Sequence, residues 1–401
     1  MSNALRAIQV VIGANYGDEG KGQTVYNIAK KFKAEGFDND KILGIKYNGG
    51  AQAGHTAKGF VHHTLSSGDT PTYLAKEFLF NPVALNRECI DYTIKRLMMP
   101  CMVYVDPRCR VTTPVDILMN QIIETVRNKD RHGSCGMGIH ATIIRNKTLP
   151  LTAKDLISDS FDRKMFTTLI KIHFNGFCQA IRDIPEIYQN IDIDLLMNDF
   201  FCEVDNCFSE NAKVLSLLDL RSFKRFIFEG GQGLLLDMDN KDNYPHVTPS
   251  HPGSQYVIDV LTDPMFYKRV KDLGITVNYV LRTFVTRHGA GELPYAEDIK
   301  YVLGKNAKGD STNIPNEWQG TMRYAKYPKD CGLSQIKHDM ELWYSTPFDL
   351  KFKPVITWQD VRPTLATVSG DVSISDYMDK FNFIAGGGFN GKCRRACKKE
   401  C

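Results

Sequence analysis

The stretch IQVVIGANYGDEGKGQT, residues 8–24, decides the fold. Its first part, Ile8–Gly13, is short, apolar and rich in β-branched residues, which is typical of a buried strand. A glycine-rich turn follows and leads into an amphipathic segment, Lys21–Glu35, which predicts a helix. A turn in this place directs backbone N–H groups and the positive end of the helix toward an anion. The stretch therefore predicts a phosphate-binding loop; the alternative is a turn that only caps the helix.

Short strands and amphipathic segments continue to alternate along the whole chain. One helix is predicted to begin after Thr113, a favourable N-cap, with Pro114 in its first turn and its end near Asn128. This alternation predicts an α/β fold in which helices flank a mostly parallel central sheet. No internal repeat or low-complexity linker is found, so we expect one domain over residues 1–390 and a basic, cysteine-containing tail over 391–401. Further strands are predicted at Lys41–Tyr47, Met102–Val105, Arg225–Phe228, Thr276–Val285 and Val355–Trp358.

Composition excludes disordered, collagenous and coiled-coil proteins. Of the 401 residues, 43% are hydrophobic and 24% are charged, as in a globular protein that buries a core. The net charge of +4 is too small to predict nucleic-acid binding. No apolar run reaches the ~18 residues that span a bilayer, and the N-terminus lacks the pattern of a secretory signal. We therefore expect a cytoplasmic protein that binds neither nucleic acid nor membranes.

The eleven cysteines do not predict a disulfide framework, because their number is odd and the chain is long. Cys393, Cys397 and Cys401 in the tail have helical spacing and could bind zinc together with a fourth ligand. The Cys-x2-Cys spacing typical of such sites is absent, however, so we expect a solvated tail instead.

The predicted phosphate loop contains two acidic residues, Asp18 and Glu19. Lys21 supplies a mobile cation for phosphate, but the spacing matches neither G-x-x-x-x-G-K-[ST] nor G-x-G-x-x-G. Carboxylates would repel a phosphate here unless a metal ion or a proton transfer requires them. The loop is therefore a candidate for catalysis as well as for binding.

A second cluster, NGGAQAGHT at residues 48–56, follows the second predicted strand. The carboxyl ends of neighbouring parallel strands meet at one edge of a sheet, so His55 can face the first loop. A lone histidine is usually structural, whereas a histidine beside an aspartate and a lysine in a phosphate loop is a candidate for acid chemistry.

Five sequence blocks, taken in chain order, resemble the adenylosuccinate synthetase family. The resemblance spans roughly residues 8–360 and implies the P-loop-NTPase-like fold of that family, with elaborations. The blocks are GDEGKG (17–22) with GGAQAGHT (49–56), GSCGMG (133–138), EGGQG (229–233), LLD (235–237) with YPHVT (244–248), and TRHGAG (286–291).

The resemblance implies a ligase that forms a C–N bond. Such an enzyme joins L-aspartate to C6 of a purine nucleoside monophosphate, using a nucleoside triphosphate and Mg²⁺. The lactam oxygen O6 is a poor leaving group, so N1 must lose its proton and O6 must be phosphorylated before it departs. By resemblance, Asp18 is the N1 base and a metal ligand, the Gly54 carbonyl is a second metal ligand, and His55 stabilises charge on O6 and on the transferred phosphoryl group.

The resemblance also assigns the residues that bind the two nucleotides. Arg145 matches an arginine that family members insert into the partner's site, which implies a homodimer; the alternative is a solvated arginine. The triphosphate's phosphates are assigned to Gly17, Glu19, Gly20, Lys21, Gly22, Gln23 and Thr56. The purine monophosphate is assigned to Gln52, Ser134, Cys135, Arg145, Gln232 and Thr248.

The sequence departs from the family pattern where aspartate and the triphosphate base are recognised. The arginine-rich loop is replaced by WQGTMRY at residues 318–324, in which Gly320, Thr321 and Arg323 remain as candidate contacts for aspartate or the triphosphate. The guanine-reading T-K-x-D motif is replaced by TWQD, residues 357–360. Asp360 keeps the carboxylate that pairs with guanine, but Trp358 could stack on any base or belong to the core, so the donor is GTP or ATP.

These departures leave other functions open. The viral branch of the family makes 2-aminoadenylosuccinate from dGMP, and it typically has serine where this chain has Asp18. The intact Asp18 favours IMP, although its carboxylate is also an acceptor for a 2-amino group. A catalytically silent nucleotide-binding homologue and a metal-dependent phosphohydrolase are the remaining alternatives.

Overall fold

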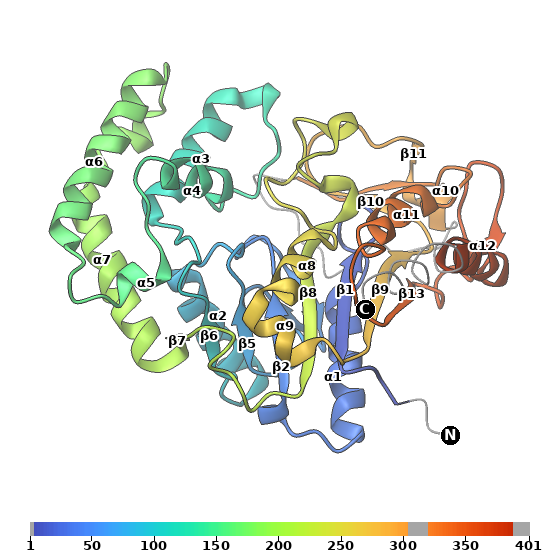
Figure 1. Cartoon of the computed structure of the whole chain (residues 1–401). Coiled ribbons are helices and arrows are strands. Elements are labelled where there is room, and N and C mark those ends of the chain that lie inside the picture. The colour runs from blue at the N-terminus through green and yellow to red at the C-terminus, as the bar shows by residue number, and fades with distance from the viewer. Residues whose placement is uncertain (1–3, 304–319, 388–401) are drawn as a thin grey trace.

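Parallel strands form the central sheet of the molecule (Figure 1). The computed structural model describes residues 4–303 and 320–387. Within these residues, an eight-stranded sheet has the order β13-β9-β1-β8-β2-β5-β6-β7, and every neighbouring pair in it is parallel. The predicted α/β class is therefore confirmed. The strands of this sheet are β1 (Ile8–Gly13), β2 (Ile42–Lys46), β5 (Thr72–Leu74), β6 (Val103–Val105), β7 (Ala212–Val214), β8 (Arg225–Gly233), β9 (Ile275–Arg282) and β13 (Leu350–Thr357).

Helices cover both faces of this sheet because side chains alternate along a strand. Ile8, Val10 and Ile12 of β1 join an apolar cluster with residues of α8, α9, α11 and α12. Val11, between them, packs on the opposite face with the apolar side of α1. The helices are α1 (Lys21–Ala34), α2 (Pro82–Arg96), α3 (Pro114–Arg127), α4 (Ile139–Asn146), α5 (Ala153–Leu156), α6 (Arg163–Ala180), α7 (Ile193–Asn206), α8 (Gln255–Thr262), α9 (Pro264–Val270), α10 (Ile299–Leu303), α11 (Leu333–Glu341) and α12 (Ile374–Gly387).

A separate apolar cluster joins the β5–β6–β7 end of the sheet to α2, α3, α6 and α7, at the left in Figure 1. Among the helices of residues 4–303 and 320–387, none combines the length and apolar character needed to cross a membrane. The tail residues Cys393, Cys397 and Cys401 lie outside the described residues. Smaller sheets pair β3 (His55–Ala57) with β4 (Phe60–His62), β12 (Arg323–Ala325) with β10 (Val285–Arg287) and β11 (Ala296–Glu297), and β14 (Thr364–Leu365) with β15 (Val372–Ser373).

Element boundaries follow the sequence most closely where local signals are strong. The predicted strand at Ile8–Gly13 is confirmed, and the predicted helix after it ends one residue early, at Ala34. Thr113 caps α3 through a capping box with Asp116, as its N-cap position predicted. The strand predicted at 276–285 is divided instead, because β9 ends at Arg282 and the chain turns before β10.

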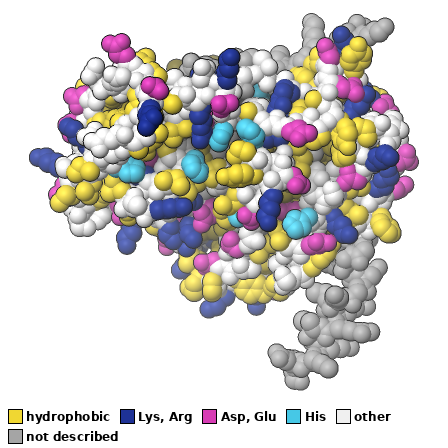
Figure 2. Space-filling view, turned by 90° about the horizontal axis from the view of Figure 1, so that it is seen from above, with side chains coloured by type: hydrophobic (Ala, Val, Ile, Leu, Met, Phe, Trp, Pro, Cys, Tyr) yellow, Lys and Arg dark blue, Asp and Glu magenta, His cyan; other side chains and the backbone are white. Residues whose placement is uncertain are grey.

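The segments that carry Asp18, His55, Gln232 and His288 lie at or after the carboxyl ends of β1, β2, β8 and β9, and these ends lie at one edge of the sheet. Figure 2 looks onto this edge from above, and histidine side chains gather near the middle of that face among basic and acidic ones. In open parallel sheets, ligands bind at this edge.

Candidate active site

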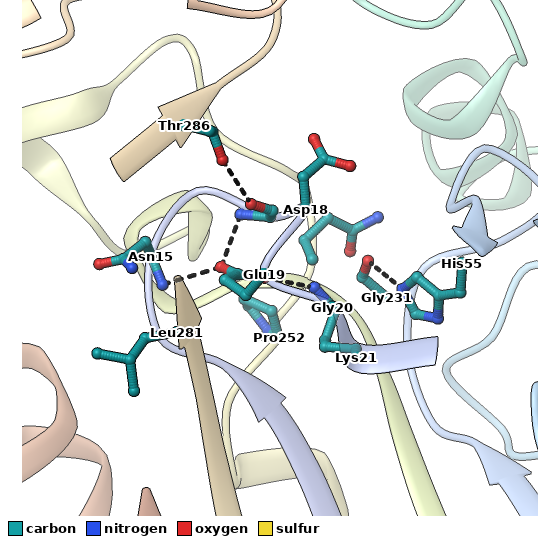
Figure 3. Close-up of polar contacts among 12 residues, drawn as sticks. Asn15, Asp18, Glu19, Gly20, Lys21, His55, Gly231, Pro252, Leu281 and Thr286 are labelled. Carbon is teal, nitrogen blue, oxygen red and sulfur yellow. Dashed lines mark hydrogen bonds and ion pairs between the residues drawn. The ribbon is translucent and has the colours of Figure 1, made fainter. Parts of the chain in front are cut away.

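The phosphate loop between β1 and α1 is organised around the carboxylate of Glu19 (Figure 3). Its Oε1 accepts hydrogen bonds from the backbone N–H groups of Asn15 at 3.0 Å and Gly17 at 2.9 Å. Its Oε2 lies 2.7 Å from Nζ of Lys21. Burial alone would raise the pKa of Glu19, but Lys21 and the two N–H groups outweigh burial and lower it. Glu19 is therefore an ionised residue that stabilises the shape of the loop.

Lys21 is not the mobile cation that the sequence predicted. Its side chain is 1% exposed and paired with Glu19. The carboxylate of Glu19 faces the loop interior, so a phosphate contact at this residue would use its backbone N–H, as expected for the amides of residues 17–22. The N–H of Gly17, however, is engaged by Glu19, which removes it from the donors expected for phosphate.

The start of α1 keeps the anion-binding character that the sequence predicted. Gly20 is the N-cap, with φ 98°, and no side chain caps the first turn there. The N–H groups of Lys21, Gly22 and Gln23 belong to that first turn, where a helix carries partial positive charge. The side chain of Gln23 lies on the exposed side of α1 and donates to Asn27 at 3.0 Å.

Asp18 projects from the same loop, with its side chain 27% exposed. Its backbone is left-handed, with φ 61°, an uncommon conformation for a residue other than glycine. Arg282 of β9 stabilises that conformation by donating from Nε to the Asp18 carbonyl. The carboxylate Oδ2 lies 3.4 Å from Nε2 of His288, a residue to which the sequence motifs assigned no role.

His55 begins β3 and packs directly against the start of α1. A Cβ built on Gly22 would lie 2.9 Å from Cβ of His55, so this glycine permits the close approach. Nδ1 of His55 lies 2.6 Å from Oε1 of Glu229. Nε2 of the same ring lies 3.2 Å from the Gly231 carbonyl, a contact drawn in Figure 3. Asp18 and His55 thus lie at the same edge of the sheet, in separate contact networks.

Glu229 on β8 determines the proton arrangement of His55. Its carboxylate also contacts Nζ of Lys46 at 2.9 Å and accepts hydrogen bonds from Ser67 Oγ at 2.5 Å and Ser67 N at 3.2 Å. Burial would raise the pKa of Glu229, but Lys46 and His55 outweigh burial and hold it well below the ordinary value. An ionised carboxylate only accepts, so Nδ1 of His55 carries a proton.

The second ring nitrogen of His55 is the one left to bind a further proton. Burial lowers the pKa of the ring, more strongly than the hydrogen bond to Glu229 raises it. In the neutral ring, Nε2 holds the lone pair, and on protonation it would donate to the Gly231 carbonyl. Only the protonated ring, with its charge paired to Glu229, would therefore stabilise negative charge nearby.

Gln52 and Gln232, two residues expected to bind the purine monophosphate, converge over Gly49. A Cβ at Gly49 would lie 3.4 Å from Nε2 of Gln52 and 3.3 Å from Nε2 of Gln232. Gln232 Oε1 accepts from Asn48 Nδ2 at 3.2 Å. The Oε1 atom of Gln52 is buried, and no residue among those described hydrogen bonds to it. A buried amide oxygen in this position is suited to a ligand donor.

The loop with Ser134 and Cys135 packs against two other blocks. A Cβ at Gly133 would lie 2.5 Å from the backbone nitrogen of Ala290, in the TRHGAG block. The rings of His132 and His246 lie 5.5 Å apart, which joins this loop to the segment that carries Thr248. Ser134 Oγ accepts from Asn120 Nδ2 at 2.9 Å, and burial raises the pKa of the Cys135 thiol to about 11. Cys135 is thus a neutral thiol, able to donate only weakly.

Comparison with known proteins identifies the family. A sequence model described as adenylosuccinate synthetase matches residues 10–314. The chain belongs to the adenylosuccinate synthetase family. It is 26% identical to the adenylosuccinate synthetase of Synechocystis over 304 residues, which are 71% of this chain and 62% of that protein. With the enzyme of Desulforamulus reducens it is 25% identical over 335 residues, 80% of this chain and 71% of that one. The aligned part spans less than two thirds of the Synechocystis protein's length.

Two solved structures share the fold. The fully ligated adenylosuccinate synthetase of Plasmodium falciparum has a TM-score of 0.63 at 17% identity, over 86% of this chain and 76% of that one. The succinoaminodeoxyadenylate synthetase of cyanophage S-2L, bound to dGMP and dATP, has a TM-score of 0.56 at 16% identity, over 94% of this chain and 90% of that one. These likenesses bear out the predicted adenylosuccinate synthetase fold.

Arg145 is a correction to what membership of the adenylosuccinate synthetase family had implied. Its side chain is 0% exposed, and its guanidinium pairs with Asp116 through Nε–Oδ1 at 2.9 Å and Nη2–Oδ2 at 3.0 Å. It also donates to the carbonyls of Leu149 at 2.8 Å and Val111 at 2.6 Å. A guanidinium satisfied in this way inside its own subunit neither reaches a partner's site nor lies in solvent. Both expectations for Arg145 were wrong.

The residues expected to recognise the triphosphate base and aspartate range from half-buried to exposed. Trp358 is half-buried at φ 63°, with Arg282 4.8 Å from its ring and Phe284 5.5 Å away edge-on, while Asp360 is exposed. Arg323 donates from Nη2 to the Gly289 carbonyl at 2.7 Å. Gly320 and Thr321 are exposed, and residues 318–319 of their loop lie outside the described residues. Thr56 is half-buried on β3, beside His55.

The donor set expected for Mg²⁺ fits a hard cation. Asp18 offers a partly exposed carboxylate, and Gly54 offers a backbone carbonyl at an exposed position. Oxygen donors of this kind suit Mg²⁺, and two protein ligands would leave places for phosphate oxygens and water.

For several residues of the site, the sequence alone predicted no role. Glu229 stood within a recognised block but had no assigned role, and Lys46 gave a usable signal because a charged residue ended an otherwise apolar strand. Ser67, Arg282 and His288 offered none, since their importance depends on which segments the fold places beside them.

Proposed function

We propose that this chain is a ligase of the adenylosuccinate synthetase type. It joins L-aspartate to C6 of an IMP-type purine nucleoside monophosphate, in purine nucleotide biosynthesis, and hydrolyses a nucleoside triphosphate in doing so. The observation that carries the proposal is the position of Asp18 and His55. Both lie beside the uncapped start of α1, one with an accessible carboxylate and the other with a ring oriented by Glu229.

The proposed chemistry follows from these groups. Asp18 takes the proton from N1, O6 of the purine then attacks the γ-phosphorus of the triphosphate, and the nucleoside diphosphate leaves. His55 stabilises the charge that develops on O6 and on the phosphoryl group. The amine of aspartate attacks C6, the C6–O6 bond breaks, inorganic phosphate departs with O6, and the amine nitrogen gives up one proton to the phosphate or to solvent. Mg²⁺, when bound, would neutralise charge on the triphosphate.

The test is product formation with each substrate omitted in turn. IMP, dIMP, GMP or dGMP is mixed with ATP or GTP, aspartate and Mg²⁺, and the succinyl product is measured by mass spectrometry. We expect product only when all three substrates are present. Asp18→Asn and His55→Asn should each lower the rate by ~10²–10⁴-fold, while the exposed-residue controls Asp379→Asn and His338→Asn should not change it. Turnover with a substrate omitted would refute the proposal.

A second candidate, a 2-aminoadenylosuccinate synthetase acting on dGMP with ATP, is favoured by one observation. The cyanophage enzyme bound to dGMP and dATP shares the fold over 94% of this chain. Product from dGMP but not IMP would select it. Triphosphate cleavage without aspartate would select a phosphohydrolase, and nucleotide binding without any product would select a silent homologue.

The homodimer also stays a proposal, now without Arg145 as its basis. Light scattering of the purified protein at several concentrations measures its mass directly. A mass that remains at one chain, 45.4 kDa, with both nucleotides present would refute it.

A further inference from the structure

The contact between His288 and Asp18 limits how Asp18 meets a purine. His288 follows β10 directly, and its Nε2 lies 3.4 Å from Oδ2 of Asp18. The side chains are 17% and 27% exposed, so the contact lies at the accessible side of the loop. One carboxylate oxygen of Asp18 therefore faces an imidazole before any ligand arrives.

The backbone on both sides of His288 is anchored by contacts of its two neighbours, Arg287 and Gly289. Before it, Arg287 is 1% exposed and donates to Asn243 at 2.8 Å and to the His246 carbonyl at 2.9 Å. After it, Gly289 packs on Gly133, whose carbonyl oxygen would lie 2.9 Å from a Cβ at position 289. The imidazole is thus carried by backbone that is anchored to neighbouring blocks.

The partner residue, Asp18, is also held in place. Arg282 donates to its carbonyl, and Thr286 Oγ1 lies 3.5 Å from the carbonyl of Gly17. Both contacts come from β9 and β10, the same segment that leads to His288. The relative position of the carboxylate and the imidazole is therefore set by the protein rather than by a ligand.

Purines differ in the number of donors that they present to a carboxylate. Guanine has two adjacent donors, N1–H and the 2-amino group, and a carboxylate meets both only when both of its oxygens are available. Hypoxanthine has N1–H alone. The imidazole of His288 lies 3.4 Å from Oδ2 and fills part of the space from which a second donor would approach that oxygen, so this carboxylate is better matched to a single donor.

We propose that His288 is a specificity-determining residue: by engaging Oδ2 of Asp18, it leaves one oxygen for the purine and favours a 6-oxopurine nucleotide without a 2-amino group. The inference rests on the proposed purine site at Asp18. It adds to that proposal which residue sets the choice between IMP-type and guanine nucleotides.

The test compares two substitutions that differ in one hydrogen-bond donor. His288→Leu removes both ring nitrogens, whereas His288→Gln keeps an N–H donor near the position of Nε2. His338→Leu, at a surface position of α11, is the matched control because its side chain is 85% exposed. For each protein, kcat/KM is measured with IMP, GMP and dGMP, and dissociation constants for IMP and dGMP are measured by calorimetry without triphosphate. Urea unfolding confirms that each variant is folded.

We expect the guanine-to-IMP ratio to rise ~10–100-fold in His288→Leu, the range for a hydrogen bond to a charged group. In His288→Gln and His338→Leu it should stay near the wild-type ratio. An unchanged ratio in His288→Leu, equal shifts in His288→Leu and His288→Gln, or a wild-type preference for guanine nucleotides would each overturn the inference.

The two proposals fail in different ways. If the wild-type protein makes product from IMP but the ratio does not respond to His288→Leu, the proposed function stands and the role of His288 is wrong. If no purine gives product while the ratio of dissociation constants shifts as expected, the ligase is wrong and the role of His288 in binding stands.

Discussion

Replacing Arg145 by methionine should destabilise the protein without weakening its purine site. The four hydrogen bonds of its guanidinium, at 2.6–3.0 Å, all end on groups of its own subunit. Methionine fills much of the volume but leaves Asp116 buried without a counter-charge. Asp116 would retain contacts from Thr113 N at 2.8 Å and Thr113 Oγ1 at 2.9 Å, which solvate a carboxylate only in part.

The expected loss in the free energy of unfolding is about 3–5 kcal/mol, the range for removing one partner of a buried ion pair. Urea unfolding followed by circular dichroism measures it, with an unchanged m-value showing that the two states compared are the same. In Arg145→Met/Asp116→Asn no buried charge remains, so most of the stability should return. IMP affinity, measured by calorimetry on folded protein, should match the wild-type value in both variants.

One pattern of results would refute this reasoning. If Arg145→Met lost less than about 1 kcal/mol, the range of an exposed pair, the guanidinium would not be buried with Asp116 in solution. If the same variant also lost IMP affinity, and mixing it with an inactive Asp18→Asn chain restored activity, the arginine would act across a dimer interface as the family resemblance had implied.

Three further substitutions test two residues of the site and a buried histidine on the neighbouring strand β4. Glu229→Gln should lower the free energy of unfolding by about 3–5 kcal/mol, because the buried Lys46 beside it loses its counter-charge; urea unfolding measures this loss. In steady-state kinetics, kcat should fall ~10–100-fold, because the His55 ring loses a charged hydrogen-bond acceptor. Gly22→Ala should lower the free energy of unfolding by about 1–3 kcal/mol and reduce kcat, because the new methyl group would lie too close to His55. The control is Gly176→Ala, where the methyl group enters open space beside a helix, and it should raise the free energy of unfolding by roughly 0.5–1 kcal/mol. His62 is buried, which lowers its pKa to about 4, so as the pH falls the unfolded chain binds a proton at this residue before the folded chain does. The free energy of unfolding should therefore fall by about 2 kcal/mol between pH 7.5 and 5. In His62→Phe, the free energy of unfolding should depend less on pH over this range.

The parts of the fold that the sequence predicted are those set by neighbouring residues. The Ile8–Gly13 strand is recognisable from its own apolar residues, and the cap at Thr113 from the three residues that follow it. The strand β8 continues to Gly233, five residues beyond its predicted end, because its glycine-rich end is paired by β1 on one side. That pairing joins segments more than 200 residues apart, so no local pattern reports it.

The same limit applies to the candidate site. Residue types and spacing led to Asp18 and His55, because each stands in a glycine-rich loop directly after a recognisable strand, although their contacts come from distant segments. The role of Glu229 depends on Lys46 and Ser67, which lie more than 160 residues away in sequence. Arg145 shows the opposite error, because its place in a family pattern predicted exposure, while Asp116, one helix earlier, holds it in the interior.

The charges at the edge of the sheet bear on how a triphosphate would bind there. Lys21 is paired with Glu19 and Lys46 with Glu229, so these four buried groups cancel. Asp18 adds an accessible negative charge on the side where a triphosphate would lie. The positive end of α1 contributes only about half a unit charge, which is less than the carboxylate it must offset. Arg282, whose Nε donates to the Asp18 carbonyl, adds one buried positive charge beside the loop, which is still fewer charges than a triphosphate carries. We therefore expect a triphosphate to bind here together with a divalent cation, which Asp18 would share. If nucleotide affinity measured by calorimetry were the same with Mg²⁺ as with excess chelator, this account of the loop would be wrong.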